Sequence, residues 1–182
     1  KYFGLNNVAN FWEGVVQLNN WHQHRISELI IRKLYGTISG KKIAILGFAF
    51  KANTNDTRES SAITICKDLI EEGATLIIHD PKVESKQITK DLGIPEKYNH
   101  ENNKENFEGE WTLAKTSADT FEGADAAIFL TEWEEYRDIN WQKVSQKMRK
   151  PAWIFDSRSI FKPEDIIKEG LNLWRIGDGR EY

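Results

Sequence analysis

Apolar side chains recur every three or four positions over the first 35 residues of the chain, as at Val8 and Trp12. This spacing predicts an amphipathic helix of about 28 residues, which would be about 40 Å long. The apolar stripe is interrupted in the middle by Asn19 and His22. Two interpretations remain open: a helix packed on the core with one polar patch, or a connector whose exposed apolar side meets another domain or subunit.

Strand-like and helix-like patterns alternate after residue 36. The predicted strands cover residues 43–48, 76–79, 111–114, 124–130, 152–155 and 171–176. The predicted helical segments cover residues 57–72, 118–121, 140–149 and 163–169, and we expect residues 84–110 to form a surface loop or insertion. Continuous apolar strands alternating with helices are typical of a parallel sheet with right-handed crossovers. We therefore predict an α/β fold: a Rossmann-like, doubly wound, mostly parallel sheet, preceded by a long connecting helix.

Composition narrows the class of protein. The 182 residues are 40% hydrophobic and 29% charged, a globular balance, with 25 Lys and Arg against 28 Asp and Glu. The sequence therefore lacks the excess of positive charge that is typical of nucleic-acid-binding proteins. It also contains no apolar run long enough to cross a membrane. A single cysteine is consistent with a reducing compartment, and we expect the cytoplasm. Because the chain starts at Lys1 without Met or a signal-peptide pattern, we expect a piece of a longer protein.

The segment after the first predicted strand carries the main candidate chemistry. It starts at Gly47 and lacks the later glycines of the dinucleotide-binding fingerprint and of the P-loop, but it contains the cations Lys51 and Arg58. We expect Asp56 to cap the following helix and Arg58 to lie in its first turn, where a phosphate could also bind. Asp56 and Glu59 could instead supply the counter-charge for Arg58.

Three further positions follow predicted strands, at the edge where doubly wound sheets bind ligands. Because Phe48 and Phe50 alternate, we expect one ring to face the core and the other to line a pocket. Arg158 is either a ligand contact or a solvated surface residue. Asp80 is either a ribose-binding acid or part of a turn.

Metal and nucleophile chemistry find little support in the sequence. Cys66 lies on the apolar stripe of a predicted helix, so we expect a buried thiol rather than a nucleophile. His22 and His24 are two positions apart and point to different helix faces, and His79 and His100 have no ligand cluster around them. We therefore predict no metal site and no catalytic residue in this chain.

Five separated motifs follow one another along the chain: Gly47-Phe48-Ala49-Phe50-Lys51, Thr54-x-Asp56-Thr57-Arg58-Glu59-Ser60-Ser61, Asp80-Pro81-Lys82-Val83, Thr131-Glu132-Trp133 and Ile154-Phe155-Asp156-x-Arg158. In order and spacing they resemble the C-terminal domain of the UDP-glucose/GDP-mannose dehydrogenase family, and the first two motifs are most similar to its UDP-glucose 6-dehydrogenase members. The N-terminal helix is also similar to the end of the long central helix of that family.

The resemblance implies an NAD-dependent parent enzyme that oxidises UDP-glucose to UDP-glucuronate in two steps, with two NAD. It implies that residues 1–36 are the C-terminal part of the central helix and that residues 37–182 are the UDP-binding domain. The N-terminal NAD domain, with the nucleophilic cysteine, would lie outside this chain, so we expect the fragment alone to be inactive. The implied partners are UDP-glucose or UDP, the protein's own N-terminal domain, and a second copy bound through the N-terminal helix.

Residue roles also follow from the resemblance. Phe50 and Lys51 match the substrate-contacting pair, Arg158 matches a UDP-contacting arginine, and Arg58 matches an arginine that reaches NAD. Ser157 stands where the family usually has Gly. Two alternatives remain: a related enzyme acting on a UDP-N-acetylhexosamine, or a chain that acts mainly as a dimerisation and assembly module when isolated.

Overall fold

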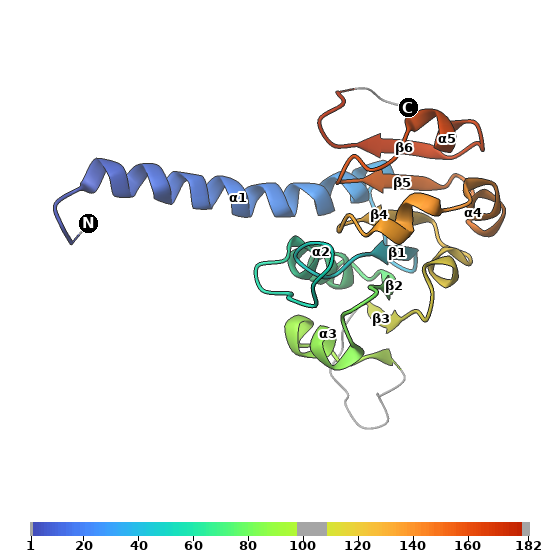
Figure 1. Ribbon diagram of the computed structural model, residues 1–182, viewed down its shortest axis with the longest axis horizontal. Helices are drawn as coiled ribbons and strands as arrows, with labels where there is room; N and C mark the ends of the chain where they lie inside the picture. Colours follow the sequence, from blue (N-terminus) through green and yellow to red (C-terminus); the bar gives the residue numbers. More distant parts are fainter. Residues whose placement is uncertain (1, 98–108, 180–182) are drawn as a thin grey trace.

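A computed structural model describes residues 2–97 and 109–179 of the chain, with one long helix projecting from a sheet-based body (Figure 1). The helices, with η for 3₁₀ helices, are α1 (Asn6–Lys33), α2 (Ser61–Glu71), α3 (Ser85–Leu92), η2 (Ser117–Phe121), η3 (Glu134–Asp138), α4 (Trp141–Lys147) and α5 (Pro163–Ile167). The strands are β1 (Lys42–Leu46), β2 (Thr75–His79), β3 (Glu110–Leu113), β4 (Ala126–Phe129), β5 (Trp153–Asp156) and β6 (Asn172–Arg175).

The strands form one six-stranded sheet in the order β3-β2-β1-β4-β5-β6, and every neighbouring pair is parallel. The predicted Rossmann-like, doubly wound fold is confirmed. The order of the strands reverses between β1 and β4, where Leu46 pairs with both His79 and Phe129. In turn, Phe129 pairs with Asp156. The segments that follow β1, β2, β4 and β5 therefore all emerge at one edge of the sheet, which is the ligand-binding edge of such folds.

The core explains why the central strands are continuous apolar runs. All four residues of β4 are buried, as are the last four of β1, because helices and loops cover both faces of the sheet. Helix α2 packs against α1 and α3, whereas η2 packs against β1, β2 and α4. Cys66 on α2 is completely buried, as predicted.

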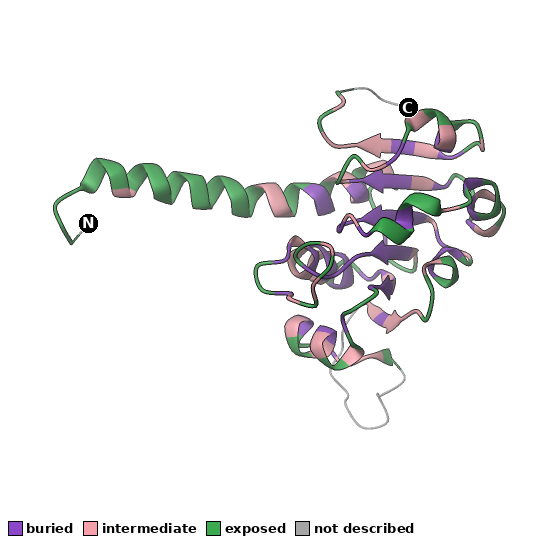
Figure 2. Cartoon of the chain, in the orientation of Figure 1, coloured by how far each residue is buried: buried purple, intermediate pink, exposed green. Residues whose placement is uncertain are grey.

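Helix α1 has the predicted length, 28 residues, but only its last third packs on the body (Figure 2). Ile26, Ser27 and Ile30 are its buried residues. Its N-terminal part projects into solvent with large apolar side chains exposed: Val8, Phe11, Trp12, Val15, Val16, Leu18 and Trp21. The packed interpretation therefore holds for the C-terminal end only. The N-terminal part has the exposed apolar side that the connector interpretation expects, and its contact with another domain or subunit stays a prediction.

Two local predictions were wrong. Helix α2 begins at Ser61, with Ser60 as its N-cap, and not near residue 57 with Asp56 as its cap. The preceding loop contains positive φ angles at Asn53 and Glu59, which end any helical path there. The predicted loop 84–110 contains α3, a short helix with only two buried residues and hence a weak periodic signal. The rest of that predicted loop falls largely on residues 98–108, outside the described residues.

None of the helices in the described ranges is long and apolar enough to cross a membrane. The same residues contain no group of three or more His, Cys, Asp or Glu side chains that could hold a metal ion.

Candidate functional site

The end of β1 is held against the end of β4 by a glycine. Gly47 has a φ of +94°, and a Cβ atom at this position would lie 2.7 Å from the backbone nitrogen of Thr131. Thr131 in turn donates a hydrogen bond of 2.6 Å from its hydroxyl to the carbonyl of Ala49. Close backbone approach and a left-handed conformation both require glycine here, so this residue shapes the mouth of the sheet.

Asp80, after β2, fixes the turn that follows β1. One carboxylate oxygen accepts hydrogen bonds from the backbone N–H groups of Phe48 and Ala49, at 2.7 and 2.9 Å, and from the indole N–H of Trp133 at 3.1 Å. The other oxygen accepts two backbone N–H groups of its own turn. Asp80 is buried and fully engaged, which supports the turn interpretation and leaves no oxygen for a ribose.

A groove of about 470 Å³ lies at this edge, between α1, the start of α2 and the segments after β4, β5 and β6. Phe50 and Arg158 both line it, so the structure brings together two residues that the sequence places more than half the chain apart. Phe48 is completely buried, whereas half of the Phe50 side chain is exposed in the groove. The prediction that one of these rings faces the core and the other lines a pocket is confirmed.

Arg158 is anchored at its inner nitrogen. Its Nε donates to the carbonyl of Leu130 at 2.7 Å, and the Glu132 carboxylate lies 3.5 Å from the same atom. The hydroxyl of the adjacent Ser157 donates a hydrogen bond of 2.6 Å to the carbonyl of Phe129. The backbone φ angle of Ser157 is not positive, so this position does not require a glycine. Within the described residues, neither terminal nitrogen of Arg158 makes a hydrogen bond, so both can bind an anion in the groove.

Lys51 and Arg58 do not line the groove; they lie around Asp56. The Arg58 guanidinium donates to both oxygens of Asp56, with Nη2 2.6 Å from Oδ2. These hydrogen bonds, assisted by the charge of Lys51, lower the pKa of Asp56 to about 2. Arg58 lies in the loop before α2, so its predicted place in the first helical turn was wrong, and the phosphate argument from that helix end no longer applies. The alternative of Asp56 as its counter-charge is confirmed.

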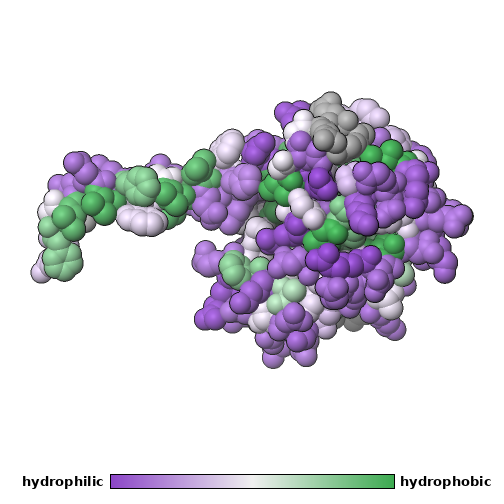
Figure 3. Space-filling model, turned by 45° about the horizontal axis from the view of Figure 1, so that its top comes forward, coloured by the Kyte–Doolittle hydropathy of each residue, from purple (hydrophilic) through white to green (hydrophobic). Residues whose placement is uncertain are grey.

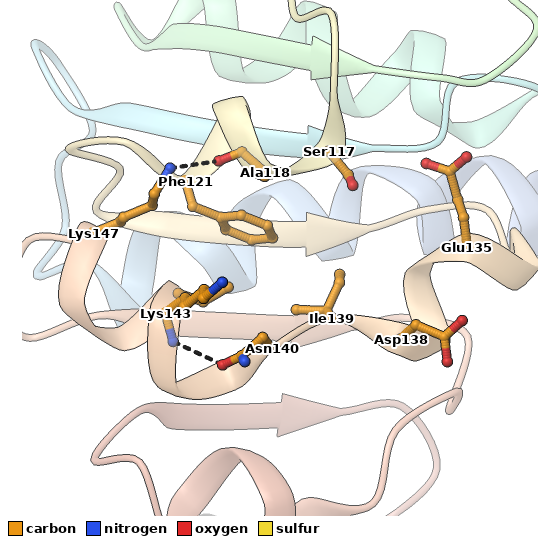
Figure 4. A pocket seen from close by; sticks show the side chains of 10 residues that line it. Ser117, Ala118, Phe121, Glu135, Asp138, Ile139, Asn140, Lys143 and Lys147 are labelled. Carbon is orange, nitrogen blue, oxygen red and sulfur yellow. Dashed lines mark hydrogen bonds between the residues drawn. The ribbon is translucent and has the colours of Figure 1, made fainter.

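A second hollow, of about 430 Å³, lies between η2, η3 and α4 and contains none of the predicted site residues (Figure 4). Its apolar wall includes Phe121 and Ile139. Lys147 at its rim is already bound to the carbonyl of Ala118 and lies 3.5 Å from Glu122. Its lining combines Glu135 and Asp138 with Lys143 and Lys147, and it contains none of the residues of the family motifs.

The sequence motifs of this edge match a known family. A family model described as the UDP binding domain of the UDP-glucose/GDP-mannose dehydrogenase family matches residues 44–163, which include every candidate residue of the loop and Arg158. The chain belongs to the UDP-glucose/GDP-mannose dehydrogenase family. The match begins within β1 and continues past β5, so the loop after β1 and Arg158 both lie within the residues that match this UDP binding domain.

Curated relatives agree with this assignment. UDP-glucose 6-dehydrogenase of Drosophila melanogaster is 42% identical over 176 residues, covering 95% of this chain and 36% of that protein. The Caenorhabditis elegans UDP-glucose 6-dehydrogenase is 40% identical over 173 residues, covering 95% of this chain and 35% of that protein. The chain therefore spans about a third of the length of the curated relatives it matches.

Solved structures of dehydrogenases share the fold. A UDP-glucose dehydrogenase from Pyrobaculum islandicum is 22% identical with a TM-score of 0.63, covering 84% of this chain and 30% of that chain. An NDP-N-acetyl-D-galactosaminuronic acid dehydrogenase from Methanosarcina mazei is 21% identical with a TM-score of 0.64, covering 88% of this chain and 29% of that chain. At these identities the comparison supports the Rossmann-like architecture alone.

Several groove residues, two polar residues of α1 among them, were absent from the predicted site of this family member. Asn19 and His22 of α1 line the same groove as Phe50 and Arg158. The sequence contained a signal for them, because they interrupt the apolar stripe of the helix, but only the packed structure shows which side of the body α1 meets.

Proposed function

We propose that this chain is the part of a UDP-glucose 6-dehydrogenase that binds the UDP moiety of the substrate, in the groove between α1 and the carboxyl edge of the sheet. The observation that carries the proposal is the arrangement of the Arg158 guanidinium. Its guanidinium is anchored at Nε, while both terminal nitrogens are free to bind phosphate at the wall of a groove beside the exposed ring of Phe50. An anchored arginine fork with free terminal nitrogens is a strong bidentate phosphate ligand.

Phe50, Lys51 and Arg58 complete the proposed ligand contacts. The exposed ring of Phe50 offers an apolar surface to the nucleotide, and Lys51, on the next residue, offers an exposed cation. Arg58 suits an outer phosphate of NAD, because 87% of its side chain is exposed and its Nη1 makes no hydrogen bond within the described part of the chain. NAD would accept hydride from the sugar in the parent enzyme, and most of its binding site would belong to another domain.

A titration with UDP tests this proposal directly. We expect UDP to bind the 182-residue chain, as followed by calorimetry or by amide chemical shifts near Lys51 and Arg158. Arg158→Gln should weaken binding by at least about tenfold, since a charge-assisted bidentate contact is lost. Arg137→Gln is the matched control, because Arg137 is paired with Glu134 on η3, outside the groove. Equal UDP affinity in the wild type and in Arg158→Gln would contradict the proposal.

A second proposed role is assembly, favoured by the apolar surface of α1. Green, hydrophobic side chains gather along the projecting arm in Figure 3. The large apolar side chains exposed on α1 include Trp12 and Val15. We propose that this surface contacts a second copy of the chain and the protein's own N-terminal domain, with residues 1–36 as the end of the central helix and residues 37–182 as the UDP-binding domain. Single exposed apolar residues are ordinary, but a continuous row of this size is typical of an interface.

Sedimentation tests the assembly role. We expect the wild-type chain to self-associate and the double variant Trp12→Ser, Val15→Ser to sediment as a monomer. Lys67→Ser, Glu71→Ser on α2 is a control that removes two charged side chains without touching this surface. A wild-type chain that is a monomer at every concentration would contradict self-association through α1.

The identity of the sugar is part of the same proposal. We propose UDP-glucose rather than a UDP-N-acetylhexosamine, because the curated relatives at 42% and 40% identity are UDP-glucose 6-dehydrogenases. We place the parent enzyme in the cytoplasm, where a chain with a single, buried cysteine stays reduced.

A further inference from the structure

Helix α1 supplies one wall of the candidate groove. Asn19, His22, Gln23 and Ile26 all line it, and their spacing of three and four residues places them on one side of the helix. Ile26 is buried, and Gln23 is hydrogen-bonded to the Thr64 hydroxyl of α2 at 3.0 Å. This side of α1 is therefore turned toward the body, and its two polar residues nearest the projecting end border the groove.

Contacts around His22 hold the helix in place without using His22. His24 lies 2.9 Å from the Asp68 carboxylate, and the Ser27 hydroxyl donates to the same carboxylate at 2.6 Å. In contrast, the half-buried imidazole of His22 makes no hydrogen bond or ion pair within residues 2–97 and 109–179. A polar side chain in this position has its hydrogen-bonding capacity available for a ligand.

Donors for an anion lie on two walls of the groove, whose lining also contains the exposed carboxylate of Glu59. Arg158 on the sheet side presents two unused terminal nitrogens, and a diphosphate has more oxygens than one guanidinium can bind. Across the groove, the imidazole of His22 and the amide of Asn19 are hydrogen-bond donors without a negative charge.

We infer that His22, with Asn19, is a phosphate-binding residue of this groove and that α1 closes the nucleoside diphosphate between its own surface and Arg158. This inference rests on the proposed UDP-binding function and adds a role for the helix that the motifs after the strands do not contain. The imidazole donates to an oxygen of the diphosphate on the side opposite to the guanidinium.

Calorimetric titration with UDP and with uridine tests this inference on the full 182-residue chain. We expect His22→Ala to raise the Kd for UDP by about fivefold to tenfold, the effect of losing one charge-assisted hydrogen bond, and His22→Gln, which keeps a donor, to restore part of the affinity. The affinity for uridine, which has no phosphate, should be the same in the wild type and in His22→Ala.

Asn19 and Asn20 form a matched pair for the same measurement. Asn19→Ala should weaken UDP binding, whereas Asn20→Ala, one position along the exposed helix and outside the groove, should not. Thermal unfolding should be unchanged in all four variants, since neither side chain of the inferred site contributes a hydrogen bond to the fold.

The possible outcomes distinguish a failure of the inference about His22 from a failure of the proposed UDP-binding function. If the wild type binds UDP and His22→Ala binds it equally well, the inference is wrong and the proposed function stands. If His22→Ala weakens UDP and uridine alike, the imidazole contacts the nucleoside, and the assignment to phosphate is wrong. If the wild type does not bind UDP at all, the proposed function and the inference are both contradicted.

Discussion

At the scale of single residues, the binding edge depends on side chains that shape the backbone. Asp80 holds the turn after β1 with one oxygen and its own turn with the other. Gly47 allows Thr131 to approach, and Thr131 binds the same turn through Ala49. The exposed Phe50 and Lys51 are thus carried on a rigid segment, as a preorganised site requires.

The requirement for glycine at position 47 is directly testable. Gly47→Ala should lower the free energy of unfolding by about 3 kcal/mol, because the new methyl group meets the Thr131 backbone and the φ of +94° is unfavourable for alanine. Gly93→Ala is the matched control: it has a φ of +73° but nothing within 4 Å of the new methyl group, so it should lose only about 1 kcal/mol. Urea unfolding of both variants measures the difference, and equal losses would exclude a steric role for Thr131.

The pair Asp56–Arg58 makes a prediction about pH. The pKa of Asp56 is lowered from 3.8 to about 2, chiefly by hydrogen bonds from Arg58, so its ionised form favours the folded state above about pH 4. That contribution is lost as the pH falls from about 4 to about 2. Arg58→Gln should return the pKa of Asp56 toward 3.8, as measured by NMR titration of the carboxyl carbon. Asp119, whose pKa is lowered mainly by hydrogen bonds from Thr116, is the internal control and should not move.

At the scale of elements, α1 joins two different environments in one helix. Its C-terminal end is fixed to α2 through Ile30, which is completely buried, and through the hydrogen bonds to Asp68. Among the described residues, the large apolar side chains of its N-terminal part stay exposed (Figure 2). Position along one continuous helix therefore decides whether an apolar residue contributes to the fold or to a surface for another chain.

Two substitutions on α1 separate these environments. Ile30→Ala should destabilise the chain by about 3 kcal/mol, since it removes a fully buried side chain and leaves a cavity. Val16→Ala, at an exposed position of the same helix, should change the stability by less than about 0.5 kcal/mol. Thermal unfolding at low protein concentration measures both. A large loss in Val16→Ala would mean that self-association contributes to the stability of the fold.

At the scale of the whole molecule, the strand order brings the site together. Phe50 follows β1 and Arg158 follows β5, and both reach one groove because β1, β4 and β5 are adjacent and parallel. Helix α1, the earliest element of the chain, adds the remaining wall. Cys66 is completely buried away from this groove edge, and burial raises the pKa of its thiol.

This leads to a prediction about activity. The purified 182-residue chain should produce no NADH from UDP-glucose and NAD, because a buried, protonated thiol does not attack a substrate. The absorbance of NADH measures this, and UDP binding by the same preparation is the control for correct folding. Turnover by the isolated chain would contradict both the proposed division of labour and the inert role of Cys66.

Much of this protein is determined locally, and the sequence alone was sufficient for those features. Six apolar runs form six strands, and the spacing over the first 35 residues forms a helix of 28 residues. The burial of Cys66 follows from the helical periodicity of its segment. Each of these features depends on residues within a few positions of one another, so a linear pattern contains the relevant information.

Other features depend on contacts between distant residues, and only the tertiary structure decided them. Asp80 offered two interpretations until its hydrogen bonds to the turn after β1 were seen, and the cap of α2 is Ser60, whose hydroxyl binds the carbonyl of Phe48. The contact between Thr131 and Ala49 spans 82 positions, and His22 meets the groove only because α1 packs on α2. The physical reason is that pairing and packing energies depend on which elements become neighbours, which no single segment of the chain specifies.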